Sequence, residues 1–161
     1  MAIIFPNQSI TQGSNNKISA TGHVLQTVQT TYTTSVVVNS LSAVDLFTST
    51  TITLASASNR ILIDFYQEVG VQDWGDGVWN LYYLDLVHVQ TSTQLTYTGY
   101  RGDYTYNRRS YKKSYLHTPG SVGPHSYKLR GWCYSALNVT FGNGYTGGDG
   151  IAYIRMMEIA G

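Results

Sequence analysis

The chain has 161 residues, which suits one domain and is enough for a hydrophobic core. Charged residues make up 12 % of it, about half the usual share, and a net charge of +1 gives the molecule as a whole little electrostatic attraction for any partner. The single cysteine, Cys133, excludes an internal disulfide and a cysteine-based zinc site.

The first 22 residues differ in composition from the rest. Residues 2–5 are apolar enough for a short strand, whereas residues 7–22 are polar, contain no aromatic residue and cannot build a core of their own. The start lacks the basic flank of a signal peptide, and no apolar run approaches the roughly 18 residues of a membrane span. We expect a soluble protein that folds in a cytoplasm. Residues 1–22 are an arm or anchor, or alternatively a flexible terminus, and residues 23–161 form the domain.

Strand signals are dense from His23 onward, because Thr and Tyr favour a pleated, half-buried surface and Ser and Gly favour turns. The cluster Asp-Trp-Gly-Asp-Gly at residues 73–77 predicts a hairpin turn, and the strand after it is long enough to contain a bulge. The spacing predicts an all-β, antiparallel β-sandwich, with a jelly roll as the favoured version. The predicted strands span residues 24–32, 35–38, 51–54, 60–68, 78–90, 94–100, 114–117, 126–132, 137–141 and 151–159.

The segment at residues 97–115 holds six of the fourteen tyrosines, interleaved with five basic residues. Tyrosine offers rigid contact area and arginine binds carboxylate or phosphate, so the segment is predicted to contact an anionic cell-envelope glycan or an acidic protein patch. A solvated loop, tyrosines packed between subunits, and stacking on nucleic acid are the alternatives. Trp74 is predicted to bind a sugar if its side chain is exposed, and otherwise to pack in the core or in an interface. The candidate contact residues are Tyr97, Tyr100, Arg101, Tyr104, Tyr106, Arg108, Arg109, Tyr111, Lys112, Lys113 and Trp74.

Metal-binding patterns are weak. Asp73 and Asp76 offer two carboxylates, whereas calcium takes six or more oxygens, so a tight turn is the simpler interpretation. The four histidines are scattered along the chain, and His117 and His125 flank a loop across which they could meet. We expect no metal and no cofactor.

Catalytic patterns are weak as well. Asp64 with Glu68, or Asp73 with Asp85, could form a glycosidase pair, but acids are few in this chain. No nucleophile motif accompanies the histidines. The sequence therefore predicts a protein that is not an enzyme.

Four segments resemble a group of proteins common in phages, especially marine ones, which comprises tail-fibre, fibre-tip and virion structural proteins. The ending Met-Glu-Ile-Ala is the most specific of these likenesses. His23 departs from the lysine usual in this group, and residues 97–115 are more aromatic and basic than usual, so ligand specificity does not carry over. The segments are GHVLQTVQ at residues 22–29, SASNRILI at 56–63, SYKLR at 126–130 and YIRMMEIAG at 153–161.

The resemblance implies a β-sandwich on a particle surface, usually trimeric and without enzymatic activity. We therefore expect a bacteriophage virion structural protein, as a fibre tip, capsid fibre or decoration protein, with a role in host attachment or contact between subunits. The short arm favours attachment to the capsid. A carbohydrate-binding receptor-recognition module is the alternative, and a polysaccharide depolymerase a further one. Expected partners are copies of this chain, other virion proteins through residues 1–22, and a host cell-envelope glycan, but neither nucleic acid nor a membrane.

Residues 78–90 and 151–160 carry apolar side chains on both faces of their predicted strands, and a partner subunit would cover the second face. Together with the resemblance, this pattern predicts a homotrimer. Light scattering of the purified protein should give the mass of about three chains. A monomeric mass would show that both faces are covered within one subunit.

Overall fold

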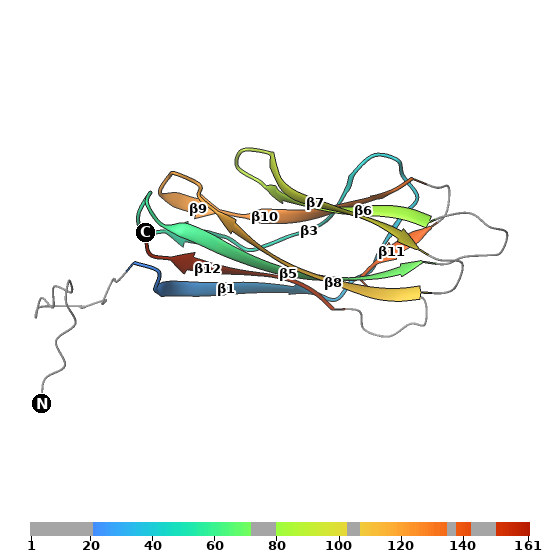
Figure 1. Ribbon diagram of the computed structural model, residues 1–161, viewed down its shortest axis with the longest axis horizontal. Helices are drawn as coiled ribbons and strands as arrows, with labels where there is room; N and C mark the ends of the chain where they lie inside the picture. Colours follow the sequence, from blue (N-terminus) through green and yellow to red (C-terminus); the bar gives the residue numbers. More distant parts are fainter. Residues whose placement is uncertain (1–20, 72–79, 103–106, 135–137, 143–150) are drawn as a thin grey trace, which may run out of the picture.

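The computed structural model describes residues 21–71, 80–102, 107–134, 138–142 and 151–161. These residues form twelve β-strands and include no helix that could span a bilayer. Figure 1 shows the strands in two facing layers, so the chain is all-β, as predicted. The strands are β1 (Val24–Tyr32), β2 (Val36–Val38), β3 (Val44–Thr48), β4 (Ile52–Leu54), β5 (Arg60–Val71), β6 (Asn80–His88), β7 (Thr93–Gly102), β8 (Asn107–His117), β9 (Gly123–His125), β10 (Tyr127–Cys133), β11 (Val139–Phe141) and β12 (Ala152–Ile159).

The strands pair in a nested order. The first long strand, β1, pairs with the last, β12, and the pairings β3 with β10, β5 with β8 and β6 with β7 follow inward along the chain, all antiparallel. One sheet runs β1-β12-β5-β11-β2, with β8 on the other edge of β5, the second runs β3-β10-β6-β7, and β4 pairs with β9. Two halves of a chain that roll up together in this way form a jelly roll. The predicted β-sandwich is therefore confirmed.

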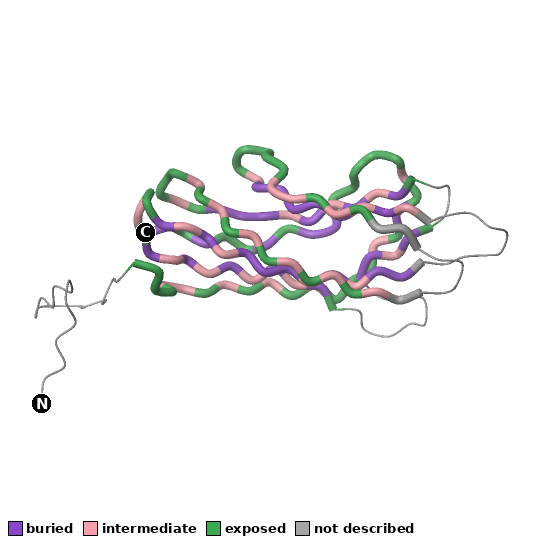
Figure 2. The backbone as a smooth tube through the Cα atoms, viewed as in Figure 1, coloured by how far each residue is buried: buried purple, intermediate pink, exposed green. Residues whose placement is uncertain are grey.

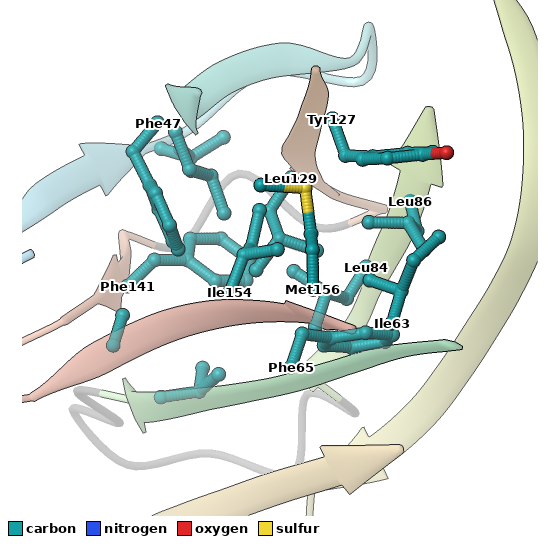
Figure 3. Packing of buried hydrophobic residues seen from close by; sticks show 14 of the residues in the cluster. Phe47, Ile63, Phe65, Leu84, Leu86, Tyr127, Leu129, Phe141, Ile154 and Met156 are labelled. Atoms are coloured by element: carbon teal, nitrogen blue, oxygen red, sulfur yellow. The ribbon is translucent and has the colours of Figure 1, made fainter. Parts of the chain in front are cut away.

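The hydrophobic core lies between the two sheets, because each long strand turns alternate side chains inward. Burial alternates residue by residue along β10 and β12. Leu129 of β10, Ile154 and Met156 of β12 and Ile63 of β5 are fully buried, and Figure 3 shows them packed together. Figure 2 shows the alternation along the backbone of both layers.

The predicted hairpin at residues 73–77 lies outside the described residues, but the strands on either side of it do not pair. The preceding strand, β5, belongs to the first sheet and the following strand, β6, to the second, so the hairpin prediction is wrong. A local turn signal cannot distinguish a hairpin from a connection between sheets. The hairpin lies instead between β6 and β7, where Ser92 has a positive φ of 54° and donates its N–H to the carbonyl of Val89. The register between β6 and β7 shifts between Leu86 and Val87, but the extra residue is Leu95 of β7, so the bulge lies in the partner strand and not, as predicted, in the strand at residues 78–90.

Two strands were not predicted. In β3 the buried residues Leu46 and Phe47 are adjacent rather than alternating, because the pairing with β10 shifts register between Leu129 and Arg130. Such a strand lacks the period of two that identifies strands in a sequence. The other strand, β9, has three residues and includes Pro124.

A buried carboxylate, that of Glu158, closes the sandwich at the end where β1 begins and β12 ends. One of its oxygens accepts hydrogen bonds from Asn59 Nδ2 at 2.6 Å and from the backbone N–H of Ala55 at 2.8 Å. The other oxygen accepts from Gln26 Nε2 at 2.6 Å. The residue is 1 % exposed, so these bonds replace the water that the carboxylate loses on folding.

The apolar outer faces of β6 and β12 are partly covered within the single chain. Tyr153 of β12 stacks on Tyr66 of β5 with ring centroids 5.6 Å apart. Leu62, Met157 and Leu116 occupy adjacent positions on three neighbouring strands of the same face, and Leu116 is 46 % exposed. Part of this face thus stays open to a partner, and the trimer stays a prediction.

Replacing Glu158 with Ala should lower the free energy of unfolding by about 3 kcal/mol, because three hydrogen-bond donors lose their acceptor in a buried site. Urea denaturation at one protein concentration measures this loss. The matched control is Asp45→Ala, which removes an acid from an exposed ion pair with Lys128 and should cost less than about 1 kcal/mol. Equal losses in the two variants would contradict the role given to Glu158.

Candidate functional site

Three aromatic side chains form a continuous surface on the outer face of the β3-β10-β6-β7 sheet, the upper layer in Figure 1. The ring of Tyr83 lies 5.1 Å from that of Trp132 and 5.8 Å from that of Tyr97, and the Tyr97 and Trp132 rings are 6.3 Å apart, all between centroids. Their planes differ by no more than 20°. Tyr97 is 54 % exposed and the other two are half-buried. Tyr83, Tyr97 and Trp132 are called the aromatic surface below.

The register of three strands produces this surface. Trp132 of β10 lies directly opposite Tyr83 of β6, and Tyr83 lies opposite Gly99 of β7. The ring of Tyr83 covers Gly99, because a Cβ atom at that position would come within 2.7 Å of Cε1 of Tyr83. Glycine at this position of the edge strand β7 therefore makes room for the ring of Tyr83. This ring stacks on that of Tyr97, which lies two residues before Gly99.

Two ion pairs lie beside the aromatic surface on the same face. Arg130 is directly opposite Asp85 and donates from Nε to Oδ1 at 3.1 Å and from Nη2 to Oδ2 at 2.6 Å. These hydrogen bonds raise the pKa of Arg130 above its ordinary value. Asp85 is 1 % exposed and lies opposite Tyr97, so the pair adjoins the rings directly. The second pair, Lys128 with Asp45, follows at 2.7 Å.

The structure separates the candidate contact residues of β8 onto two faces. Arg109, Tyr111 and Lys113 alternate with the exposed Ser110 and Lys112. The hydroxyl of Tyr111 bonds to that of Tyr82 at 2.7 Å, and Lys113 Nζ donates to Thr96 Oγ1 at 2.5 Å. Both bonds join β8 to the opposite sheet. Tyr111 and Lys113 therefore hold the two sheets together, whereas Lys112 faces outward.

The other candidate contact residues are placed less completely. Tyr97 belongs to the aromatic surface. Tyr100 and Arg101 lie in β7 and Arg108 lies in β8, where the structure describes their backbone alone. Trp74, Tyr104 and Tyr106 lie outside the described residues. The predicted contact role of residues 97–115 stays a prediction.

Tyr83, Trp132 and Arg130 are not among the contact residues predicted from the sequence. Tyr83 lies in the predicted strand at residues 78–90, where a subunit contact was expected, and Trp132 and Arg130 lie in the predicted strand at residues 126–132, to which no contact was assigned. Gly99, a glycine inside a strand pattern, was the one available signal, since such a residue often marks a close approach.

Three histidines that are far apart in the sequence meet at one end of the sandwich. Nε2 of His88 lies 3.1 Å from Nδ1 of His125, and the rings of His88 and His117 are 4.8 Å apart. Nδ1 of His117 lies 2.8 Å from the hydroxyl of Tyr127. The described part of the chain nevertheless contains no group of three His, Cys, Asp or Glu side chains arranged to hold a metal. The expected meeting of His117 with His125 thus takes place through His88.

The acids proposed as a glycosidase pair have separate partners. Asp64 accepts hydrogen bonds from Ser114 at 2.6 Å and from Arg155 at 2.5 Å, while Glu68 accepts one from Tyr66. Burial opposes the ionisation of Asp64, but the bonds from Ser114 and Arg155 outweigh it and hold the pKa of the carboxyl below its ordinary value. A general acid needs the opposite shift. Asp73 lies outside the described residues, as does Asp76 of the calcium alternative.

A pocket of about 540 Å³ lies beside Glu158, between Gln26 and Asn59. Both of these side chains donate to the carboxylate of Glu158. The polar groups that line the pocket are therefore already engaged in closing the fold.

No family model matches the sequence. No curated protein matches it either. Fifteen chains of solved structures match its fold. One of them comes from the structure of infectious bursal disease virus, Gx strain, with a TM-score of 0.45 and 13 % sequence identity. The match covers 96 % of this chain and 43 % of the viral one, so this chain spans less than half of the other.

The histidine cluster predicts a loss of stability in mild acid. Burial first, and then the charges of His88 and His125, lower the pKa of His117 to about 4, and burial lowers that of His88. Since an unfolded histidine titrates near about 6.5, the unfolded chain binds more protons between these values, and stability falls as pH decreases through that window.

Urea unfolding at about pH 7 and about pH 5 measures the effect. His117→Gln should reduce the difference between the two conditions, whereas the control His23→Gln, at an exposed position, should preserve it. Equal pH dependence in the two variants would rule out the cluster as its source.

Proposed function

We propose that the chain is a non-catalytic structural protein of a bacteriophage particle. It is displayed on the particle surface as a fibre tip, capsid fibre or decoration protein, and it serves attachment or contact between subunits. Fold alone does not establish function, although jelly rolls recur in viral capsid proteins and in lectins. The proposal therefore depends on how the segments that resemble phage virion proteins are used in this fold.

Three of those four segments meet in space, and this observation carries the proposal; the fourth, residues 126–130, lies in the other sheet. Residues 22–29 form the start of β1, residues 56–63 lead into β5, and residues 153–161 form β12 and the end of the chain. The order β1-β12-β5 makes them neighbours in one sheet. Gln26, Asn59 and Glu158, one from each segment, join in the hydrogen bonds that close the sandwich.

Further contacts at this corner also come from the resembling segments. The N–H of Gly22 donates to the carbonyl of Ala160, and the N–H of Ala160 donates to that of His23, each at 2.9 Å. Gly161 donates to Asn59 Oδ1, and a Cβ atom on Gly161 would lie 2.0 Å from the carbonyl oxygen of Ser58. The resembling residues thus act together, because they close the same corner of the sandwich. A shared task of this kind supports a shared fold and class of protein better than three unrelated short matches would.

The test detects the chain on intact particles. An antibody raised against the purified protein should label the surface of phage particles in immunogold microscopy. Particles without label, from a host culture that makes the chain, would contradict the proposal.

Removing residues 1–20 tests the role of the arm separately. The truncated chain keeps Gly22 and its bond to Ala160, so its β-type circular dichroism should match that of the full chain. Incorporation into particles should be lost, because the arm is the proposed link to other virion proteins. Equal incorporation of both forms would show that the domain itself makes the attachment.

A further inference from the structure

We propose that the aromatic surface of Tyr83, Tyr97 and Trp132 binds a pyranose ring of an uncharged glycan, with the Arg130–Asp85 pair contacting its hydroxyl groups. This proposal rests on the proposed function only for the place where the protein encounters such a glycan. The binding itself is a property of the isolated protein. It uses one residue of the 97–115 segment, Tyr97, and four that lie outside that segment.

The geometry of the rings is the first argument. A pyranose has a face of C–H groups that carry a slight positive charge, and this face is attracted to the negative face of an aromatic ring. The three rings stack on one another within 20° of parallel, so that together they form one aromatic cluster at the sheet surface. The rings hold one another in place, so little side-chain entropy is lost on binding. The exposure of Tyr97, at 54 %, leaves ring surface available to a ligand.

The polar neighbours are the second argument. Ligand sites combine aromatic area with a few fixed polar groups that set orientation. The fork between Arg130 and Asp85 engages Nε and Nη2, which fixes the guanidinium plane and directs Nη1 away from the carboxylate. Because Asp85 lies opposite Tyr97, the guanidinium group of Arg130 lies next to the aromatic surface. Its N–H groups suit sugar hydroxyls as hydrogen-bond acceptors.

The charge balance identifies the class of ligand. Among the side chains that the structure describes, this face carries two cations, Arg130 and Lys128, and two acids, Asp85 and Asp45, paired one to one. Nucleic acid also stacks on aromatic rings, but it needs a surplus of cations for its phosphates. An uncharged glycan needs no such surplus. The balanced charge therefore favours a neutral sugar over a polyanion.

The experiment uses the full chain and four probes, the methyl glycosides of glucose, galactose, mannose and N-acetylglucosamine. Saturation-transfer NMR should detect binding of at least one probe, and titration should give an affinity in the millimolar range, as expected for a single ring on an open surface. Tyr97→Ala and Trp132→Ala should each weaken that affinity by about tenfold or more. Gly99→Ala keeps all three rings but displaces Tyr83, and it should weaken binding as well.

The matched control is Tyr153→Ala. Tyr153 also stacks on a tyrosine at an outer face and also has an Arg–Asp pair nearby, but it belongs to the opposite sheet. This variant should bind like the parent. Circular dichroism and urea unfolding identify any variant that fails to fold, and Gly99→Ala then provides the test with all aromatic side chains present.

Three results would overturn the proposal. One is the absence of a signal with all four glycosides, and another is an equal loss of binding in the Tyr153 variant. The third is a change in the light-scattering mass of Tyr97→Ala with no change in glycoside binding, which would make the surface a subunit contact. None of these results depends on where the protein is found, so they are distinct from failure of the particle-labelling test.

Discussion

The carboxylate of Glu158 lies buried where the first and last strands of the sandwich meet the turn that leads into β5, and it accepts hydrogen bonds from both sides. In a nested topology the two ends of the chain must pair with each other, which is the most distant contact in the sequence and the most costly to close by entropy. A buried acceptor that only the correct register satisfies makes that closure specific. The inner pairings, from β3 with β10 to β6 with β7, lie along the chain between β1 and β12, whose pairing Glu158 closes.

Each sheet also carries an Arg–Asp pair between directly opposite residues on its outer face. Arg130 faces Asp85 in the second sheet, and Arg155 faces Asp64 in the first. Both acids are buried, so each needs its partner, and each arginine covers part of a strand that would otherwise be wet. The aromatic stacks Tyr83–Trp132 and Tyr66–Tyr153 lie beside these pairs.

These outer faces connect the fold to the proposed roles. A protein displayed on a particle needs a rigid frame and a surface that can bind a partner. The frame comes from the Glu158 corner and from the contacts of Tyr111 and Lys113 between the sheets. The face comes from side chains that the core does not use. This division explains why residues 97–115, which look uniform in the sequence, contribute both to holding the sheets together and to the surface.

The sequence by itself determined the fold class, most of the strands and the four segments that resemble phage virion proteins, because strand propensity and alternation are local properties of the chain. It did not determine which strands pair, and so the signal at residues 73–77 was taken for a hairpin although β5 and β6 belong to different sheets. Nor could it bring Trp132, Tyr83 and Tyr97 together, since they come from three strands and meet only through the register of β10, β6 and β7. Tertiary structure also decided the faces of β8. Whether Tyr111 and Lys112 point inward or outward depends on a register that a shift of one residue would reverse.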